Sequence, residues 1–249
     1  MDLSGRTIAI TGASSGIGEA TALACARAGA AVALAARRGD RIEALAARID
    51  EEGGRAVALP TDVTDEREAR AFVEHAYEQL GALDGLVNNA GVMLLGPVAG
   101  APTEEWRRMV EVNLLGLLYC THAALPLLLA DDADGPRDIV NVSSVAGRIA
   151  SAGSAVYNMT KWGVGAFSEG LRQEVTGQGV RVTIVEPGAV ATELPGHNRP
   201  EIREMMMKRF DGVTPLESDD IARAIVYALS QPPNVSINEV LVRPTSQTR

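Results

Sequence analysis

Tyr157 and Lys161 are the pair of side chains in this sequence whose types and spacing suggest chemistry. Residues four positions apart on a helix lie on one face, one turn above the other. A neighbouring ammonium stabilises a phenolate, so it lowers the pKa of a tyrosine from its free value of about 10 toward neutrality. We therefore expect Tyr157 to act as a general acid or base at pH 7, with Lys161 lowering the pKa of its phenol.

Two serines belong to the same stretch. Ser154 precedes the pair at a position suited to a helix N-cap, and no proline follows until Pro187. Ser144 follows a strand-like run at 138–143 and could hydrogen-bond the same substrate oxygen as Tyr157. Because Tyr-x-x-x-Lys pairs also occur by chance on surface helices, the pair alone leaves a purely structural role open.

The composition is typical of a globular protein and disfavours two classes of partner. The 249 residues are 46% hydrophobic and 22% charged, which suits one large α/β domain or two small ones. The net charge of −9 and the pI near 4.9 disfavour nucleic acid or an anionic membrane as partner. The apolar run at 114–130 is short for a bilayer span and contains Pro126, so we expect a buried or interfacial helix and no membrane partner.

The cysteines, histidines and N-terminus carry no signal for export or metal binding. Cys25 and Cys120 lie in apolar helical sequence and are expected to be reduced core thiols. His75, His122 and His197 lack metal-ligand spacing, so we expect no metal site. The N-terminus has no apolar core of the kind found in signal peptides, and we expect a cytoplasmic protein.

Strand-like and helix-like segments alternate along the whole chain. Strands are expected at 7–11, 31–36, 56–59, 83–87, 139–142, 180–185 and 239–242, and helices at 16–29, 40–52, 64–80, 103–130, after Ser154 and at 218–230. Continuous apolar strands separated by helices indicate a parallel sheet covered on both faces. With no linker or internal repeat, residues 1–249 are predicted to form a single doubly wound, Rossmann-type α/β domain.

A glycine-rich turn follows the first strand and opens the first helix. Gly12 would permit a tight turn, Gly16 would let the backbone approach a phosphate, and Gly18 would let the helix pack on the sheet. The spacing is G-x-x-x-G-x-G, and a purely structural glycine turn is the alternative. The cofactor contacts expected from this loop are Gly12, Ser14, Ser15, Gly16, Ile17 and Gly18.

Arg37 and Arg38 follow the second strand, where an NAD site would place an acidic residue for the ribose 2′-hydroxyl. A guanidinium suits a 2′-phosphate instead, so the sequence favours NADP over NAD. The alternative is that both arginines simply begin a solvated helix.

Polar residues also follow the third and fourth strands. Asp62, beside Val63, could accept a hydrogen bond from an adenine amino group, and the turn Asn88-Asn89-Ala90-Gly91 could support a cofactor. Asn113 stands amid leucines, and a buried asparagine must be hydrogen-bonded. For Asn113 a catalytic water relay and simple structural bonding remain alternatives.

The order of these motifs resembles the short-chain dehydrogenase/reductase family over essentially the whole chain. The matching residues are Thr11-Gly12-x-x-x-Gly16-Ile17-Gly18, Asp62-Val63, Asn88-Asn89-Ala90-Gly91, Asn113, Ser144, Tyr157-x-x-x-Lys161 and Pro187-Gly188 with Thr192. The resemblance implies that Tyr157 protonates a carbonyl oxygen steadied by Ser144. It also implies that Lys161 holds the nicotinamide ribose and that Asn113 anchors a water relaying protons to Lys161.

The resemblance adds cofactor contacts and one departure. Val190 and Thr192, after Pro187 and Gly188, would engage the nicotinamide carboxamide. Many NADP-dependent members carry a basic residue where this chain has Ser15, so recognition of the phosphate would rest mostly on the two arginines. Family spacing favours Ser144 over its neighbour Ser143 as the catalytic serine.

Three segments narrow the resemblance. Residues 92–98, 192–197 and 238–245 are similar to clavulanic acid dehydrogenases and to NADP-dependent 3-hydroxy acid dehydrogenases. Residues 188–215, called the lid segment below, are predicted to close over the substrate. Candidate substrate contacts are Met93, Ser144, Leu194 and Met205, and candidate partners of a substrate carboxylate are Arg148, Arg199 and Arg203.

The sequence therefore predicts an NADPH-dependent carbonyl reductase acting on a small aldehyde or ketone, such as a clavulanate-type β-lactam aldehyde, or the reverse alcohol oxidation. The alternatives are an NADP-dependent 3-hydroxy (amino) acid dehydrogenase and a catalytically silent NADP-binding regulatory protein. Apolar residues lie on more than one face of the helix at 103–130. Together with the family resemblance, they predict a homodimer or homotetramer built on this helix and the Tyr157 helix.

Overall fold

A seven-stranded, fully parallel sheet forms the centre of the molecule in this computed structural model, which describes residues 1–130, 135–209 and 212–248. The strands are β1 (Thr7–Thr11), β2 (Ala31–Ala36), β3 (Arg55–Pro60), β4 (Gly85–Asn88), β5 (Arg137–Val142), β6 (Val180–Pro187) and β7 (Glu239–Val242). They lie in the order β3-β2-β1-β4-β5-β6-β7. The order reverses between β1 and β4, which opens a crevice at their carboxyl ends. The predicted doubly wound, Rossmann-type fold is confirmed.

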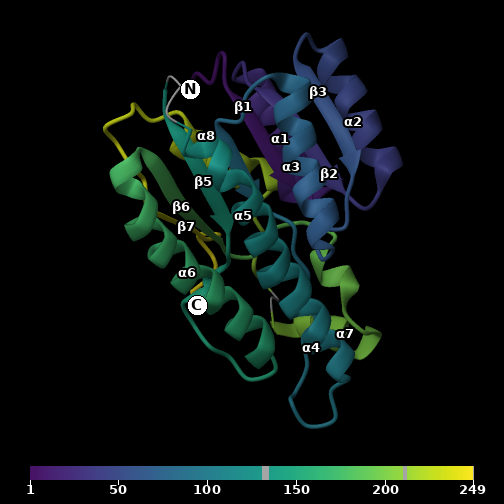
Figure 1. The fold of residues 1–249 in the computed structure, drawn as a ribbon. Coiled ribbons are helices and arrows are strands. Elements are labelled where there is room, and N and C mark those ends of the chain that lie inside the picture. Colours follow the sequence, from purple (N-terminus) through teal and green to yellow (C-terminus); the bar gives the residue numbers. More distant parts are fainter. Residues whose placement is uncertain (131–134, 210–211, 249) are drawn as a thin grey trace.

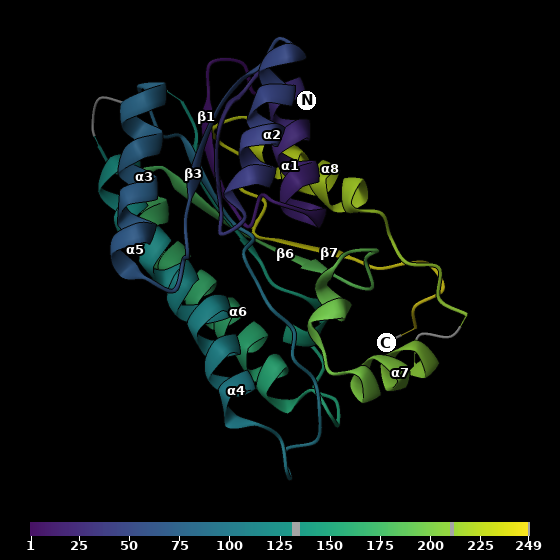
Figure 2. The same cartoon turned by 90° about the vertical axis from the view of Figure 1, so that its right-hand side faces the viewer.

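Helices cover both faces of the sheet (Figures 1 and 2). One layer holds α1 (Gly16–Arg27), α2 (Gly39–Glu51) and α8 (Ser218–Leu229), and the other holds α3 (Glu66–Leu80), α4 (Thr103–Val110), α5 (Gly116–Leu128) and α6 (Ala155–Val175). Each layer has its own buried core against the sheet. Strands β1 and β6 are buried along their whole length and β2 in all but its first residue, which is why their sequences are largely continuous apolar runs rather than alternating ones.

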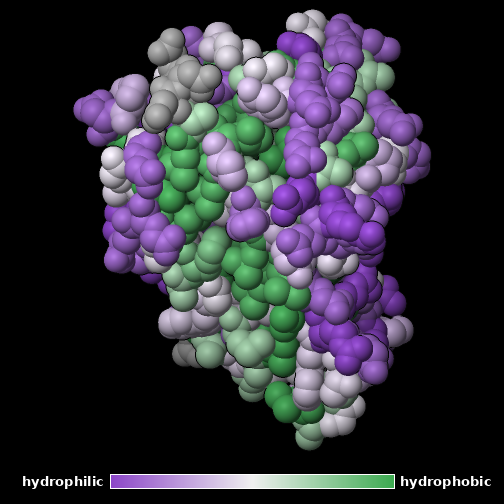
Figure 3. All heavy atoms as spheres, viewed as in Figure 1, coloured by the Kyte–Doolittle hydropathy of each residue, from purple (hydrophilic) through white to green (hydrophobic). Residues whose placement is uncertain are grey.

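The helix predicted at 103–130 is continuous from Thr103 to Leu128 and contains one π turn, Glu111–Leu115, between α4 and α5. By length and composition alone it is the one helix among the described residues long and apolar enough to cross a membrane. It packs on α3, α6, β4 and β5 as part of the helical layer. A strip of apolar surface remains along α5 (Figure 3).

The predicted cap of α6 is only partly right. Ser154 occupies the N-cap position, but its side chain makes no capping hydrogen bond. Its main-chain carbonyl instead accepts the first helical bond, from the N–H of Asn158.

At the amino ends of the strands, opposite the crevice, Asp138 forms a buried ion cluster. Its carboxylate accepts from Arg6 at 2.6 Å and from two nitrogens of Arg181 at 2.8 and 2.7 Å. Arg181 also donates to the carbonyl of Leu229 at the end of α8 and to that of Val235 beyond it. One guanidinium thus ties β5 and β6 to the end of α8 and the segment that follows.

Candidate active site

Tyr157 and Lys161 project from the first turns of α6 toward the carboxyl end of β5. Both side chains are buried, and the Lys161 Nζ lies 5.9 Å from the centre of the Tyr157 ring. The phenol also hydrogen-bonds Ser144, the second residue after β5. The structure therefore brings together the Tyr157 phenol, the Lys161 ammonium and the Ser144 hydroxyl, which the sequence predicts to form one site.

The pKa of Tyr157 does not shift in the predicted direction. Burial raises it to about 12, while the hydrogen bond with Ser144 acts in the opposite sense. The expected lowering is therefore wrong: burial of the phenol outweighs the hydrogen bond with Ser144, and the Lys161 ammonium donates to the carbonyl of Val142 at 2.9 Å. Burial lowers the pKa of Lys161 to about 8.

The two adjacent serines have different partners. Ser143 is buried, and its hydroxyl donates to the main-chain carbonyl of Lys161 at 3.0 Å, which ties β5 to α6. Ser144 is half-buried; its Oγ accepts from the N–H of Ala146 at 3.1 Å and donates to the Pro187 carbonyl at 3.4 Å. Of the two, Ser144 is the one that bonds the phenol, and its catalytic role, which the family spacing favours, stays a prediction.

Asn113 lies in the π turn and is bonded on both sides of its amide. Its Oδ1 accepts from the N–H of Val92 at 2.8 Å, and its Nδ2 donates to the Val92 carbonyl at 2.9 Å and to Thr160 at 3.1 Å. These bonds favour the structural alternative for this side chain. They fix the strand-end loop after β4 against α6, next to Lys161.

The glycine loop between β1 and α1 has the geometry of a cradle for a phosphate. Gly12 and Gly16 adopt φ of 68° and 60°, a region that favours glycine. A Cβ on Gly18 would lie 2.3 Å from the Gly12 carbonyl oxygen, so only glycine fits there. The start of α1 can therefore approach a dinucleotide closely, and these residues fit NAD or NADP.

The turn after β4 braces this loop. The Asn89 amide donates to the carbonyls of Thr11 and Gly12 at 3.0 and 3.2 Å. The Thr11 hydroxyl accepts from the N–H groups of Asn89 and Ala90. The Asn89 side chain thus stabilises the glycine loop. The part of this turn left to contact a cofactor is the small surface of Ala90 and Gly91.

The arginines after β2 differ in what they contact. The Arg38 guanidinium donates to the hydroxyl of Ser14 at 2.9 Å and to that of Ser15 at 2.7 Å. Arg37 is exposed and helps to lower the pKa of His197, together with burial, the largest cause, and Arg108. Arg38 is therefore the arginine that faces the glycine loop.

The remaining predicted cofactor residues lie along the same edge of the sheet. Asp62 accepts from the N–H and hydroxyl of Thr64 at 3.0 and 2.8 Å, while Val63 is buried under Gly116. Thr192 lies against the glycine loop, since a Cβ on Gly16 would be 3.2 Å from its methyl carbon. Of the other predicted positions, Ile17 lies in the first turn of α1, Pro187 ends β6, and Gly188 and Val190 follow β6 at this edge.

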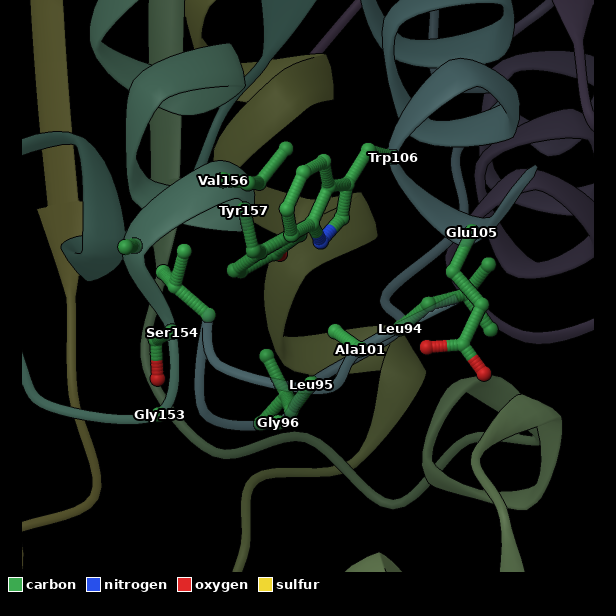
Figure 4. Close-up of a pocket in the computed structure, with 12 residues that line it drawn as sticks. Leu94, Leu95, Gly96, Ala101, Glu105, Trp106, Gly153, Ser154, Val156 and Tyr157 are labelled. Atoms are coloured by element: carbon green, nitrogen blue, oxygen red, sulfur yellow. The ribbon is translucent and has the colours of Figure 1, made fainter. Parts of the chain in front are cut away.

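A small pocket borders Tyr157, with Trp106 lying beside Tyr157 and Val156 and with Glu105 and Ser154 also in its lining (Figure 4). Leu94 and Leu95 form part of its wall. The pocket measures only about 10 Å³, which is room for one water molecule. In this conformation it does not admit a substrate.

The lid segment contributes α7 (Pro200–Arg209), whose Ile202 and Met206 pack in one buried cluster with Tyr157 and Val92. Of the predicted substrate contacts, Met93 packs on this cluster and Leu194 is half-buried. Met205 is 44% exposed, so Met206 takes the inward position instead. The predicted lid residues Phe210 and Asp211 lie outside the described part of the chain.

Two residues that sequence reasoning missed hold the lid segment down. The Asn198 Oδ1 accepts from the N–H of Leu95 at 2.6 Å. Glu105 on α4 pairs with Arg199 at 3.0 Å. The signal available was weak, because neither the asparagine nor the glutamate belongs to a recognisable motif.

The arginines predicted to meet a substrate carboxylate have protein partners. Arg148 pairs with the buried Glu186 at 2.7 Å and with Glu239 on β7. Arg199 pairs with Glu105 and Glu201. Arg203, the third candidate, is exposed.

No group of three or more metal-ligating side chains is found within residues 1–130, 135–209 and 212–248. The thiols of Cys25 and Cys120 are buried, and burial raises the pKa of each to about 12. Both therefore remain protonated and unreactive at neutral pH.

Comparison with known proteins identifies relatives along the whole chain. A model of the short chain dehydrogenase family matches residues 6–203. The chain is 39% identical over 247 residues to an uncharacterized oxidoreductase of Staphylococcus saprophyticus, covering 98% of this chain and 97% of that protein. It is 42% identical over 245 residues to the glycine betaine reductase ATRR of Emericella nidulans, covering 98% of this chain. This chain spans only 19% of the length of that reductase.

Solved structures are also similar to this chain over nearly its whole length. The closed form of a serine dehydrogenase complexed with NADP⁺ is 31% identical with a TM-score of 0.88, covering 98% of this chain and 96% of that one. Among other similar structures, one was solved with NADP and one with NADH. This chain is an oxidoreductase and belongs to the short-chain dehydrogenase family.

Proposed function

We propose that this protein is an NADPH-dependent carbonyl reductase that interconverts a small aldehyde or ketone and the corresponding alcohol. The observation that carries the proposal is the convergence of Tyr157, Ser144 and Lys161 beside a small pocket, at the edge of the sheet that also carries the glycine loop. When bound, the nicotinamide would supply the hydride that reduces the carbonyl carbon.

The side chains of this chain would manage the proton. A phenol whose pKa is raised to about 12 stays protonated across the neutral range, so Tyr157 is ready to donate to a carbonyl oxygen. Ser144 would hydrogen-bond the same oxygen and hold it in line with the phenol. The Lys161 charge would stabilise the phenolate left after transfer and would bind the nicotinamide ribose.

The preference for NADPH rests on Arg38. Its guanidinium and the hydroxyls of Ser14 and Ser15 form a cluster of donors suited to a 2′-phosphate. The other cofactor contacts that we propose are those predicted from the sequence, from the glycine loop to Thr192.

The substrate is proposed to be small and largely apolar, such as a clavulanate-type aldehyde. Apolar pocket walls at Leu94, Leu95 and Trp106 support that class. A 3-hydroxy (amino) acid is the second candidate, supported by the likeness to the NADP⁺-bound serine dehydrogenase. The ion pairs that engage Arg148 and Arg199 argue against it.

The test is loss of NADPH fluorescence with a panel of aldehydes and ketones, including β-lactam aldehydes, and gain of fluorescence with NADP⁺ and 3-hydroxy amino acids. Turnover in the first set supports the reductase, and turnover only in the second supports the hydroxy acid dehydrogenase. Binding of NADPH without turnover of any compound would indicate a silent NADP-binding protein.

We also propose a cytoplasmic homodimer or homotetramer whose interface includes α5 and α6. An apolar strip lies along α5 (Figure 3), and Met159 and Trp162 of α6 have exposed fractions of 54% and 52%. Exposed apolar patches of this kind mark interaction sites. Light scattering at micromolar concentration tests the proposal, and a monomer would contradict it.

A further inference from the structure

The carboxylate of Glu193 is held between two arginines at the edge of the glycine loop. One oxygen accepts from Arg38 Nη1 at 2.8 Å and the other from Arg41 Nη1 at 2.8 Å. Ser15 hydrogen-bonds the same carboxylate. Glu193 follows Thr192 in the lid segment, whereas both arginines belong to the β2–α2 region on the other side of the crevice.

The donors around Glu193 form a set suited to a phosphate group. Arg38 contacts Ser14, Ser15 and Glu193 at once, and Arg41 adds a second guanidinium. Guanidinium and hydroxyl donors arranged around one anion are the chemistry by which proteins bind phosphate monoesters. The carboxylate of Glu193 therefore occupies a position where a bound phosphate could accept hydrogen bonds from the same arginines and serines.

Glu193 is an anion at every working pH. Hydrogen bonds from Arg41 first, and then from Arg38, lower the pKa of its carboxyl to about 2. It therefore competes with any other anion for the two guanidinium groups under all assay conditions.

A phosphate group could displace the Glu193 carboxylate from the two arginines, because both ion pairs are exposed to solvent. The exposed fractions of the Arg38, Arg41 and Glu193 side chains are 40%, 46% and 48%, and ion pairs so exposed contribute little to stability. Arg41, Ser15 and Glu193 also line an open groove of about 620 Å³ beside the start of α1, so solvent and ligands reach them.

We propose that Glu193 is an internal anion that the 2′-phosphate of NADP(H) displaces, and that Arg41 joins Arg38 as a ligand of this phosphate. The inference rests on the proposed use of NADPH. Glu193 is then a specificity-determining residue: it lowers the affinity for NADPH, while NADH has no 2′-phosphate to exchange for it.

If Glu193 instead helps to bind the phosphate, removing its charge should change the NADPH affinity in the opposite direction. If Glu193 only orients the two guanidinium groups for the phosphate, removing its charge leaves them disordered and weakens NADPH binding. If it competes with the phosphate, removing its charge strengthens NADPH binding. The sign of the change therefore distinguishes a competitor from a brace.

The experiment measures dissociation constants of NADPH, NADH and the fragment 2′,5′-ADP for the full chain by calorimetric titration. The variants are Glu193→Gln and Arg41→Gln, with Arg48→Gln as matched control. Arg48 lies on the same helix α2 and pairs with Glu52 instead. Thermal unfolding of each variant verifies that it is folded.

We expect Glu193→Gln to tighten NADPH and 2′,5′-ADP by about three- to tenfold, the scale of two exposed ion pairs, with less than about twofold change for NADH. Arg41→Gln should weaken the same two ligands by about tenfold, the scale of one charge-assisted bond. Arg48→Gln should bind all three ligands as the wild type does.

Two outcomes overturn the inference, and they are distinguishable. Weaker NADPH binding by Glu193→Gln, with a wild type that prefers NADPH, would show that Glu193 is a brace and would leave the proposed function intact. Equal affinities of the wild type for NADPH and NADH would contradict the cofactor assignment itself, and the inference would fall with it.

Discussion

The Lys161 ammonium lies 5.9 Å from the centre of the Tyr157 ring, yet its hydrogen bond goes to the carbonyl of Val142. The four-residue spacing on α6 thus brings the charge close to the phenol without a direct bond. Burial controls both pKa values, upward for the tyrosine and downward for the lysine. With its pKa at about 8, Lys161 is mostly protonated at neutral pH, and its charge would favour the phenolate once the ammonium is held toward the phenol.

Replacing Tyr157 by phenylalanine should remove the proton donor and keep the ring in its apolar cluster. We expect turnover to fall by about 10²–10⁴-fold, the usual contribution of a general acid, with NADPH affinity nearly unchanged. Steady-state assays and NADPH titration measure the two effects separately. A variant that keeps more than about a tenth of wild-type turnover would rule out this role.

The buried Lys161 should make stability depend on pH in a defined window. Its pKa falls from the ordinary 10.5 to about 8 on folding, so between these values the unfolded chain binds more protons than the folded one. The lysine therefore costs stability below pH 8, and this cost is lost as pH rises toward 10.5. Lys161→Met should be more stable than the wild type near pH 7, with the difference shrinking by pH 10.

Thermal unfolding of both proteins across this pH range measures the difference directly. Tyr157 acts in the other direction above pH 10, where its raised pKa lowers stability as pH rises, but it is present in both proteins. A difference between the two proteins that stays constant with pH would contradict the lowered pKa of Lys161.

The two arginines after β2 should not be equivalent. Arg38 donates to Ser14 and Ser15, whereas Arg37 is exposed. We expect Arg38→Ala to weaken NADPH binding by roughly 1.5–3 kcal/mol, about ten- to a hundredfold, and Arg37→Ala to weaken it less. NADH binding should change little in either variant. Fluorescence titration gives all four constants, and equal losses of both cofactors would mean that Arg38 does not contact the phosphate.

The ion cluster at the amino ends of the strands should matter for stability rather than activity. Asp138→Asn removes the charge that faces two buried guanidinium groups, and we expect a loss of about 3–5 kcal/mol in the free energy of unfolding. Glu52→Gln, which breaks exposed pairs, is the control and should cost at most about 1 kcal/mol. Urea denaturation measures both, and similar small losses would show that the buried cluster is not an anchor.

The lid segment should change its protection when ligands bind. Ile202 and Met206 of α7 pack in one buried cluster with Tyr157, and the pocket beside Tyr157 measures only about 10 Å³, so we expect α7 to move when a substrate binds. We expect amides of residues 193–209 to exchange fast in the cofactor-free enzyme and slowly with NADPH and substrate bound. Asn198→Ala, which frees the N–H of Leu95, should speed exchange further. Equal protection with and without ligand would mean that the segment is ordinary scaffold.

Local pattern was sufficient for the fold and for the motif-bearing part of the site. Continuous apolar strands alternating with helices require a parallel sheet with two covered faces, and this alternation placed every strand to within a few residues. The order of strands and loops then brings the ends of β1, β4, β5 and β6 to one edge. That is why residues as far apart as Gly12 and Tyr157 could be assigned to one crevice before its geometry was known.

Tertiary structure determined the hydrogen-bond and ion-pair partners of the site residues, because these bonds join segments that are distant in the sequence. The direction of the Tyr157 pKa shift follows from burial, which spacing on a helix does not report. The bond of Lys161 to Val142 and the pairing of Glu193 with Arg38, 155 positions away, exist only because separate loops meet at the edge of the sheet. Sequence spacing determines which residues share a helix face; packing determines which groups compete for the same charge.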